Sequence, residues 1–283
     1  MPALRVLGLT ALAMLAFAAN SLLCRLALAG GGIDPASFGS LRLLSGAVVL
    51  ALVWRWRAGA AAPAPRDWLA PLMLFGYVAF FSFAYLSLSA GTGALILFGA
   101  VQLTMLVGGW RQGEVFGPWG WGGFALAVAG LVWLVLPGVS APPPLGAALM
   151  AAAGVAWGVY SLRGRGVANP LAATARNFLV ATPLALLLSL ALLPRAHADA
   201  HGVALAVASG ALTSGLGYVI WYAALPGLTS LRAATVQLSV PPLAALGGAL
   251  FLAEPLGARL VGASVAILGG IALVLMRRRS RAI

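Results

Sequence analysis

Residues 236–257, VQLSVPPLAALGGALFLAEPLG, have an earlier counterpart at residues 96–117, ILFGAVQLTMLVGGWRQGEVFG. At an offset of 140 residues Glu254 falls on Glu114, and these are the only two glutamates in the chain. The same offset places Arg165 on Arg25, and it aligns Gly248, Gly257, Gly262 and Gly270 with Gly108, Gly117, Gly122 and Gly130. Repetition at one fixed offset indicates a duplicated structural unit. We therefore expect two copies of one unit, residues 1–137 and 144–277.

The composition is that of a membrane protein. Hydrophobic residues make up 62% of the 283 residues, charged residues make up 8%, and the mean hydropathy is +1.03. Apolar runs of about 20 residues are typical of membrane-spanning helices. Ten such segments are expected, near 4–29, 37–54, 68–89, 92–110, 118–136, 144–162, 171–193, 202–225, 229–252 and 257–276. The first contains Asn20 and Arg25 and is too long for a signal peptide, so we interpret it as an uncleaved span.

The arginines predict the orientation of these spans. If the N-terminus is cytoplasmic, twelve arginines lie at the cytoplasmic face, namely Arg5, Arg55, Arg57, Arg66, Arg111, Arg163, Arg165, Arg232, Arg277, Arg278, Arg279 and Arg281. Only Arg195 and Arg259 lie at the opposite face. Cytoplasmic loops are enriched in basic residues, so both termini are expected in the cytoplasm. The net charge of +12 then reflects topology, and we expect no nucleic-acid partner.

An odd number of spans in each copy has a consequence for the architecture. The second copy must enter the membrane from the opposite side, so the fold class is an all-α membrane protein of ten transmembrane helices in two inverted five-helix repeats. Inverted repeats place a binding site near the middle of the membrane, between the copies, and allow alternating access. Pro142, Pro143 and Pro144 separate the two copies.

Few residues in the chain are suited to chemical catalysis. The acids are Asp34, Asp67, Glu114, Asp199 and Glu254, all in loops or at the ends of spans. Cys24 is the only cysteine, and the two histidines share one loop. Acid–base and metal-assisted reactions need clustered carboxylates or histidines. We therefore expect neither an enzyme, nor a metal site, nor a cofactor. A proton-coupled exporter of organic cations, which needs a buried carboxylate, is also disfavoured.

Polar and aromatic residues at mid-depth in the spans are the candidate substrate site. Aromatic side chains at this depth differ from the interfacial belt, which sits at the ends of spans. Together they suit a cavity for a planar or amphipathic molecule, although each alone is also compatible with helix packing. The candidates at mid-depth are Asn20, Tyr77, Phe81, Gln102, Thr104, Trp157, Tyr160, Tyr218, Trp221, Gln237 and Ser239. Arg42, nearer the outer end of the second span, is added as a candidate for binding a substrate carboxylate.

Four further residues are candidates for structural or gating roles. Arg25 and Arg42 lie inside apolar segments, where a charge is costly, so each either extends to the membrane surface, pairs between helices or binds a substrate carboxylate. Glu114 and Glu254 precede the fifth and tenth spans, where a carboxylate would meet the free N–H groups of the following helix; a gating contact is the alternative. Pro241 is a candidate for bending the ninth span.

These residues resemble the EamA family of the drug/metabolite transporter superfamily. The likeness covers nearly the whole chain, through Asn20-Ser21 with Arg25, Arg42, Ala156-Trp157 with Tyr160, residues 218–225, and the two spans that lead to Glu114 and Glu254. Where this family often has a proline in the fourth span, the chain has Gln102 and Thr104. The resemblance implies a ten-span exporter of amino acids, aromatic ones among them, or of similar small metabolites.

The prediction is therefore a secondary transporter in the bacterial inner membrane. Its partners would be a small-molecule substrate and the lipid bilayer, and a monomer would suffice. Export of nucleobases, sugars or drugs is the first alternative, and a membrane-embedded enzyme is a remote one. A channel is less compatible with an inverted repeat.

Overall fold

The computed structural model describes residues 3–57, 67–111, 117–136, 138, 141–164, 167–228, 233 and 236–276. In this part of the chain the regular structure is helical, with one isolated β-bridge between Ile33 and Ala198. The α-helices are α1 Ala3–Ala29, α2 Pro35–Arg57, α3 Leu69–Ala84, α4 Ala90–Arg111, α5 Pro118–Val135, α6 Pro144–Arg163, α7 Pro170–Ala191, α8 Ala200–Ala208, α9 Gly217–Ala224, α11 Val240–Leu252 and α12 Ala258–Met276. A π-helix, η2 Ser209–Leu216, joins α8 to α9, and two 3₁₀ turns follow α7 and α9, η1 Leu193–Arg195 and η3 Leu225–Gly227.

Helix length and composition fit a protein that crosses a membrane several times. Among the described residues, seven helices are long and apolar enough to span a bilayer, counting Ala200–Gly227 as one continuous helix. Three shorter apolar helices, α3, α11 and α12, accompany them. Proline residues begin α2, α5, α6 and α7, because the first helical position has no internal use for the missing N–H.

The structure departs from the expected spans in two places. The third span was expected to reach residue 89, but α3 ends at Ala84 and a turn leads to α4. The eighth was expected as one regular helix and instead changes to π geometry at Ser209. Part of the ninth expected span, residues 229–232 and 234–235, lies outside the described residues.

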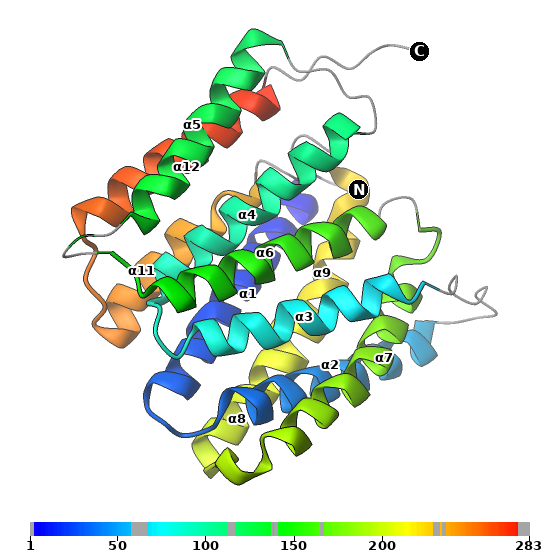
Figure 1. Cartoon of the computed structure of the whole chain (residues 1–283). Helices are drawn as coiled ribbons and strands as arrows, with labels where there is room; N and C mark the ends of the chain where they lie inside the picture. The colour runs from blue at the N-terminus through cyan, green and yellow to red at the C-terminus, as the bar shows by residue number, and fades with distance from the viewer. Residues whose placement is uncertain are drawn as a thin grey trace.

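Helices from the two chain halves pack against one another throughout the bundle (Figure 1). From the first half, α3 and α4 both pack on α6. In a matching way, α1 packs on α9 and α11 from the second half. Helix α2 packs on α7 and η2, α4 packs on α11, and α5 packs on α12 to form a pair at one side of the bundle. Helix α1 begins and α12 ends at the same end of the bundle.

The pair formed by α5 and α12 depends on glycine. A Cβ atom on Gly123 would lie 2.5 Å from the carbonyl oxygen of Gly270, and one on Gly270 would lie 2.5 Å from that of Gly123. The two backbones can approach this closely only because neither residue has a side chain. The adjacent Gly122 and Gly269 have no atom within 4 Å of an added Cβ. Only one glycine of each neighbouring pair is therefore required by packing.

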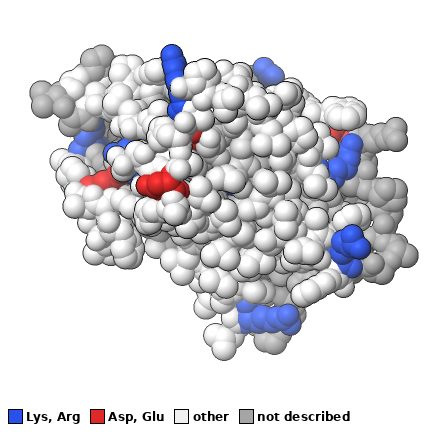
Figure 2. All heavy atoms as spheres, turned by 90° about the horizontal axis from the view of Figure 1, so that it is seen from below, with Lys and Arg blue, Asp and Glu red and all other residues white. Residues whose placement is uncertain are grey.

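The surface is largely uncharged, and its few charges lie mostly toward two sides of the face drawn in Figure 2. At the end where α1 finishes, the loop before α2 pairs with the loop before α8: the Asp34 N–H donates to the His197 carbonyl at 2.9 Å and the Asp199 N–H to the Gly32 carbonyl at 2.7 Å. Each aspartate also caps its helix, since Asp34 accepts from Ala36 and Ser37 and Asp199 accepts from Gly202. These loops hold α2 and α8 side by side.

Candidate functional site

A small cavity of ≈ 30 Å³ lies where α1, α2, α3, α4, α6, η2 and α9 meet. Ligand pockets usually enclose about 300–1,000 Å³, and about 30 Å³ is the share of a single water molecule. The cavity is thus too small for an organic ligand, which would enter only if the surrounding helices moved apart. Its lining consists of Phe17, Asn20, Ser21, Arg42, Tyr77, Phe81, Leu97, Phe98, Trp157, Thr213, Ser214, Tyr218 and Gln237.

Arg42, on α2, is the one charged side chain in this lining. It is 1% exposed, so of the three alternatives for this residue, extension to the membrane surface is ruled out. Its Nη2 donates to the Tyr77 hydroxyl at 2.9 Å and its Nε to Ser214 Oγ at 3.1 Å. The guanidinium also lies 5.1 Å and 5.0 Å from the ring centres of Tyr77 and Phe81, which places it in cation–π range. Arg42 therefore contacts neutral partners.

One nitrogen of Arg42 is left without a partner. Nη1 is buried and makes no hydrogen bond to any described residue. A buried charge normally needs an opposite charge or a full set of hydrogen bonds, and leaving it without them costs several kcal/mol, on the order of 3–5. The geometry therefore provides a buried cation beside the cavity, and its Nη1 has no hydrogen-bond partner among the described residues.

Aromatic rings from both chain halves form a continuous cluster around the cavity. Trp157 on α6 stacks on Tyr218 of α9 with ring centres 5.4 Å apart and an interplanar angle of 16°. Trp157 also stacks on Tyr160, and its ring centre lies 4.8 Å from that of Tyr77 on α3. Phe17 on α1 joins the cluster through edge or tilted contacts with Tyr218 and Trp221. A flat or aromatic molecule would find complementary surfaces here.

Hydroxyl groups of η2 connect it to α1 and α2. Asn20 Oδ1 on α1 accepts from Ser209 Oγ at 2.7 Å and from Thr213 Oγ1 at 3.1 Å. Ser214 bonds Arg42, as described above. Helix η2 lies against α2 at Gly210, where an added Cβ would collide with the carbonyl oxygen of Arg42. The π-helix and this glycine together bring the hydroxyl groups within reach of the cavity.

Seven of the twelve expected substrate-site residues line this cavity: Asn20, Arg42, Tyr77, Phe81, Trp157, Tyr218 and Gln237. Tyr160 and Trp221 belong to the adjoining aromatic cluster, Tyr160 on Trp157 and Trp221 on Phe17. Gln102 is 3% exposed but lies outside the lining. Thr104 donates to the Ala100 carbonyl on its own helix and packs against Gly158. Ser239 is exposed and donates to the Val236 carbonyl, away from the cavity.

The sequence did not name Phe17, Ser21, Thr213 and Ser214 as substrate-site candidates, nor the apolar lining residues Leu97 and Phe98. A cluster of three hydroxyls, Ser209, Thr213 and Ser214, within one apolar segment was the available signal. Serine and threonine in spans usually bond their own helix, which is why that signal is weak.

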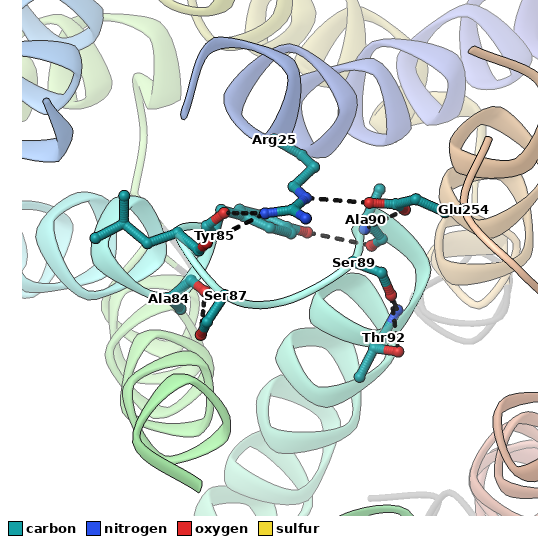
Figure 3. A network of polar contacts seen from close by, with 9 residues as sticks. Arg25, Ala84, Tyr85, Ser87, Ser89, Ala90, Thr92 and Glu254 are labelled. Atoms are coloured by element: carbon teal, nitrogen blue, oxygen red, sulfur yellow. Dashed lines mark hydrogen bonds and ion pairs between the residues drawn. The ribbon is translucent and has the colours of Figure 1, made fainter. Parts of the chain in front are cut away.

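Arg25 and Glu254 meet at the end of the bundle where α1 finishes (Figure 3). Arg25 Nε lies 3.1 Å from Glu254 Oε1, and Arg25 Nη1 donates to the Tyr85 carbonyl at 2.9 Å and to the Leu86 carbonyl at 3.3 Å. Glu254 Oε2 accepts from the Ala90 N–H at 2.7 Å. We call this set, Arg25, Tyr85, Leu86, Ala90 and Glu254, the end clamp. Arg25 thus pairs between helices and does not face the cavity.

The end clamp corrects the expectation for Glu254. We expected its carboxylate to cap the helix that follows it, α12. It caps α4 instead, a helix of the other chain half. Glu114 lies outside the described residues. Pro241 falls in the first turn of α11, directly after a turn at residues 238–239, and a missing N–H there breaks no helical bond. Its role in bending the ninth span stays a prediction.

Comparisons with known proteins agree with this architecture. Residues 144–276 match the model of the EamA-like transporter family. An uncharacterised protein of Pseudomonas aeruginosa is 56% identical over 282 residues, which is 100% of this chain and 98% of that protein. The chain belongs to the EamA-like transporter family. This EamA-like protein is therefore a multi-pass membrane protein of a family whose members are transporters of small molecules and are not enzymes.

A solved crystal structure of another protein shares the fold of the EamA-like protein. It superposes with a TM-score of 0.66, is 23% identical, and the match covers 95% of this chain and 99% of that one. The similarity concerns the arrangement of helices along nearly the full length of both chains. The helical fold is therefore not confined to the second half, where the family model matches.

Proposed function

We propose that this EamA-like protein is a secondary transporter that exports amino acids, aromatic ones included, or similar small metabolites from the cytoplasm. It would work by alternating access through the central cavity. In this proposal the chain crosses the bacterial inner membrane ten times, with both termini in the cytoplasm, as two inverted five-helix repeats, residues 1–137 and 144–277.

The helix positions support the repeat. Shifted by the offset of 140 residues, α5 falls on 258–275, the range occupied by α12, and α3 falls on 209–224, the range of η2 and α9. The packing supports it as well. If α1 to α5 correspond in order to α6, α7, the α8–η2–α9 helix, α11 and α12, then exchanging the halves turns the contact of α3 with α6 into that of α1 with α9. The same exchange turns α4 with α6 into α1 with α11.

The observation that carries the substrate assignment is the buried Arg42 guanidinium with its open Nη1. A substrate carboxylate would provide both the missing charge and the missing hydrogen bond, and charge-assisted bonds to guanidinium are among the strongest in proteins. The aromatic cluster of Tyr77, Trp157 and Tyr218 would hold the body of the substrate. Helices of both halves supply these groups, so relative movement of the halves would open or close the site.

Counterflow in proteoliposomes tests this function. Vesicles containing the purified full-length protein are loaded with unlabelled phenylalanine and leucine, and uptake of each labelled amino acid is followed at symmetric pH and zero membrane potential. Saturable exchange above that of protein-free liposomes is expected, with at least about a tenfold reduction in Arg42→Gln. If the protein is folded by size-exclusion chromatography and thermal unfolding yet exchanges no amino acid, the amino-acid assignment is wrong. Nucleobases, sugars and other neutral metabolites then become the better candidates.

A further inference from the structure

The cavity contains one formal charge, and this sets a preference among carboxylate-bearing molecules. We propose that the preferred substrate is a monoanion, an organic carboxylate with a flat apolar body and no ammonium group, and that each transport cycle moves one negative charge outward. This inference rests on the proposed function, because it concerns the same cavity. It differs from that function in ranking a net negative ion above a zwitterionic amino acid.

The carboxylates of the described residues all bond groups outside the cavity. Asp34 and Asp199 cap α2 and α8 at the loops, Asp67 accepts from Arg163 Nε at 2.8 Å, and Glu254 belongs to the end clamp. None of these carboxylates is among the cavity-lining residues. The positive charge of Arg42 therefore has no built-in opposite charge within the described part of the site.

Binding of a monoanion would make the site neutral. A zwitterion would leave a net positive charge, because its ammonium group would stay in the same low-dielectric space as the guanidinium. Charges interact strongly where water is excluded, so this difference matters much more here than in solution. Neutral oxygens and ring faces near the cavity would compensate an ammonium group only in part.

The geometry also offers a carboxylate two donors. Arg42 Nη1 has no described partner, and the Tyr77 hydroxyl accepts from Nη2, which leaves its own hydrogen able to donate. These groups would bind the two oxygens of one carboxylate. Trp157 and Tyr218, stacked 5.4 Å apart, and Phe17 present ring surfaces to an attached aromatic body. Charge and shape thus favour an aromatic carboxylate.

Movement of a monoanion without a compensating ion would respond to membrane potential. A potential that is negative inside drives anions out of the cell, and 100 mV supports a concentration ratio of about 50-fold for one charge. Export of such a substrate needs no proton-carrying side chain. A zwitterion moved by the same cycle would carry no net charge and would not respond to the potential.

Phenylalanine and 3-phenyllactate form a matched pair of probes, since the second has a hydroxyl group in place of the ammonium. Uptake of each labelled compound is measured in proteoliposomes of the full-length protein, with protein-free liposomes as the leak control. A potassium gradient with valinomycin sets the interior potential to zero or to +100 mV. We expect phenyllactate to reach half-saturation at a concentration at least about tenfold lower than phenylalanine. We also expect only phenyllactate to accumulate at +100 mV, toward a limit of about 50-fold.

Arginine variants test whether this preference comes from Arg42. Arg42→Lys keeps the charge and should keep the order of the two probes, whereas Arg42→Gln should abolish the preference. Arg195→Gln removes an exposed arginine outside the cavity lining and should leave the preference for phenyllactate unchanged. Exchange of phenylalanine with equal or higher affinity, or phenyllactate uptake that ignores the potential, would overturn the inference while leaving the transport function intact. Exchange of neither probe by folded protein would overturn both.

Discussion

Arg25 and Glu254 lie 229 residues apart in the sequence, yet their side chains meet at 3.1 Å and connect the two chain halves. Both are mostly buried, with side-chain exposures of 21% and 13%. The glutamate also accepts from the first N–H of α4, so one carboxylate ties α1 to α4. A partly buried pair of this kind is worth more than an exposed one, because water and salt screen it less. If the bundle opens at this end, as the proposed alternating access requires, we expect the end clamp to break.

Glu254→Gln should loosen the bundle beside Arg25. Cys24, the only cysteine of the chain, is fully buried next to Arg25 and reports opening without any engineered label. We expect its rate of reaction with a maleimide to rise about tenfold in the variant, the factor that corresponds to about 1.4 kcal/mol. Asp67→Asn breaks the exposed pair with Arg163 at the opposite end of α3 and should not raise the rate. An unchanged rate in Glu254→Gln would rule out a gating role for the end clamp.

Tyr77→Phe should weaken substrate binding without unfolding the protein. The change removes the hydroxyl that accepts from Arg42 Nη2 and leaves the ring in the aromatic cluster. A hydrogen bond to a charged group contributes about 1.5–3 kcal/mol, so the half-saturating concentration should rise about 10- to 100-fold in the counterflow assay. Ser239→Ala removes an exposed hydroxyl that bonds its own helix and is the matched control. Equal affinity in both variants would show that Tyr77 does not support the binding group.

Alanine at Trp157, Gln102 or Trp221 should reduce transport while leaving the protein folded. The positions of the three residues predict which substitution has the largest effect. Trp157 lines the cavity and stacks on two tyrosines, so Trp157→Ala should have the largest effect, at least about 100-fold on the initial rate. Trp221 and Gln102 lie outside the lining, and Trp221 packs edge-on against the lining residue Phe17, so smaller losses are expected. Counterflow rates normalised to folded protein give the comparison. Full activity in all three would contradict the site assignment.

Gly123→Ala should destabilise the pair formed by α5 and α12. The new methyl group would meet the Gly270 carbonyl at 2.5 Å and force the helices apart, at a cost of about 1–3 kcal/mol. Gly122→Ala adds the same group at a neighbouring position with no atom within 4 Å, so its melting temperature should stay the same or rise slightly. Thermal unfolding in detergent compares the two. A similar change in both variants would show that this close approach is not important for stability.

Acid should weaken the contact between the loops that precede α2 and α8. Burial opposes ionisation of Asp34, but hydrogen bonds from Ser37, His197 and Ala36 outweigh it and hold the pKa of this carboxyl below its ordinary value. A lowered pKa means that the stabilisation is present above about pH 3.9, the unfolded value, and is lost as the pH falls through the folded value. Asp34→Asn should therefore lower the melting temperature at pH 7 and flatten its decline in acid. A parallel decline in both proteins would contradict this assignment.

Much of the helical pattern was predictable because local chemistry sets it. The apolar runs are long, and prolines at positions such as Pro118 and Pro144 mark helix starts. The end of α3 at Ala84 was missed because Tyr85 and Leu86 are as apolar as the helix before them. Their carbonyls leave the helix to accept from Arg25, a contact that depends on tertiary structure.

The sequence indicated which kinds of residue form the site, but not which of them face the cavity. The cost of a charge inside an apolar segment pointed to Arg42, and mid-depth polarity pointed to Tyr77; the two side chains bond each other at the cavity. The same criterion selected Thr104 and Ser239, whose hydroxyls bond carbonyls of their own segments and so need no cavity. It missed Phe17, since an aromatic ring in an apolar run gives no sign of the side it faces. Which face points inward is decided by packing between helices distant in sequence.

The π-helix Ser209–Leu216 determines which hydroxyls can act together. In an α-helix, residues five apart lie about 140° around the axis, so Ser209 and Ser214 would lie on widely separated faces. Bonding from residue i to i+5 winds the chain less per residue, which brings such residues closer to the same face. Ser209 can therefore serve Asn20 while Ser214 serves Arg42. The direction in which each side chain of this segment points is thus part of substrate recognition. Loss of a single residue here would leave a continuous helix, but Ser214 would no longer face the Arg42 guanidinium.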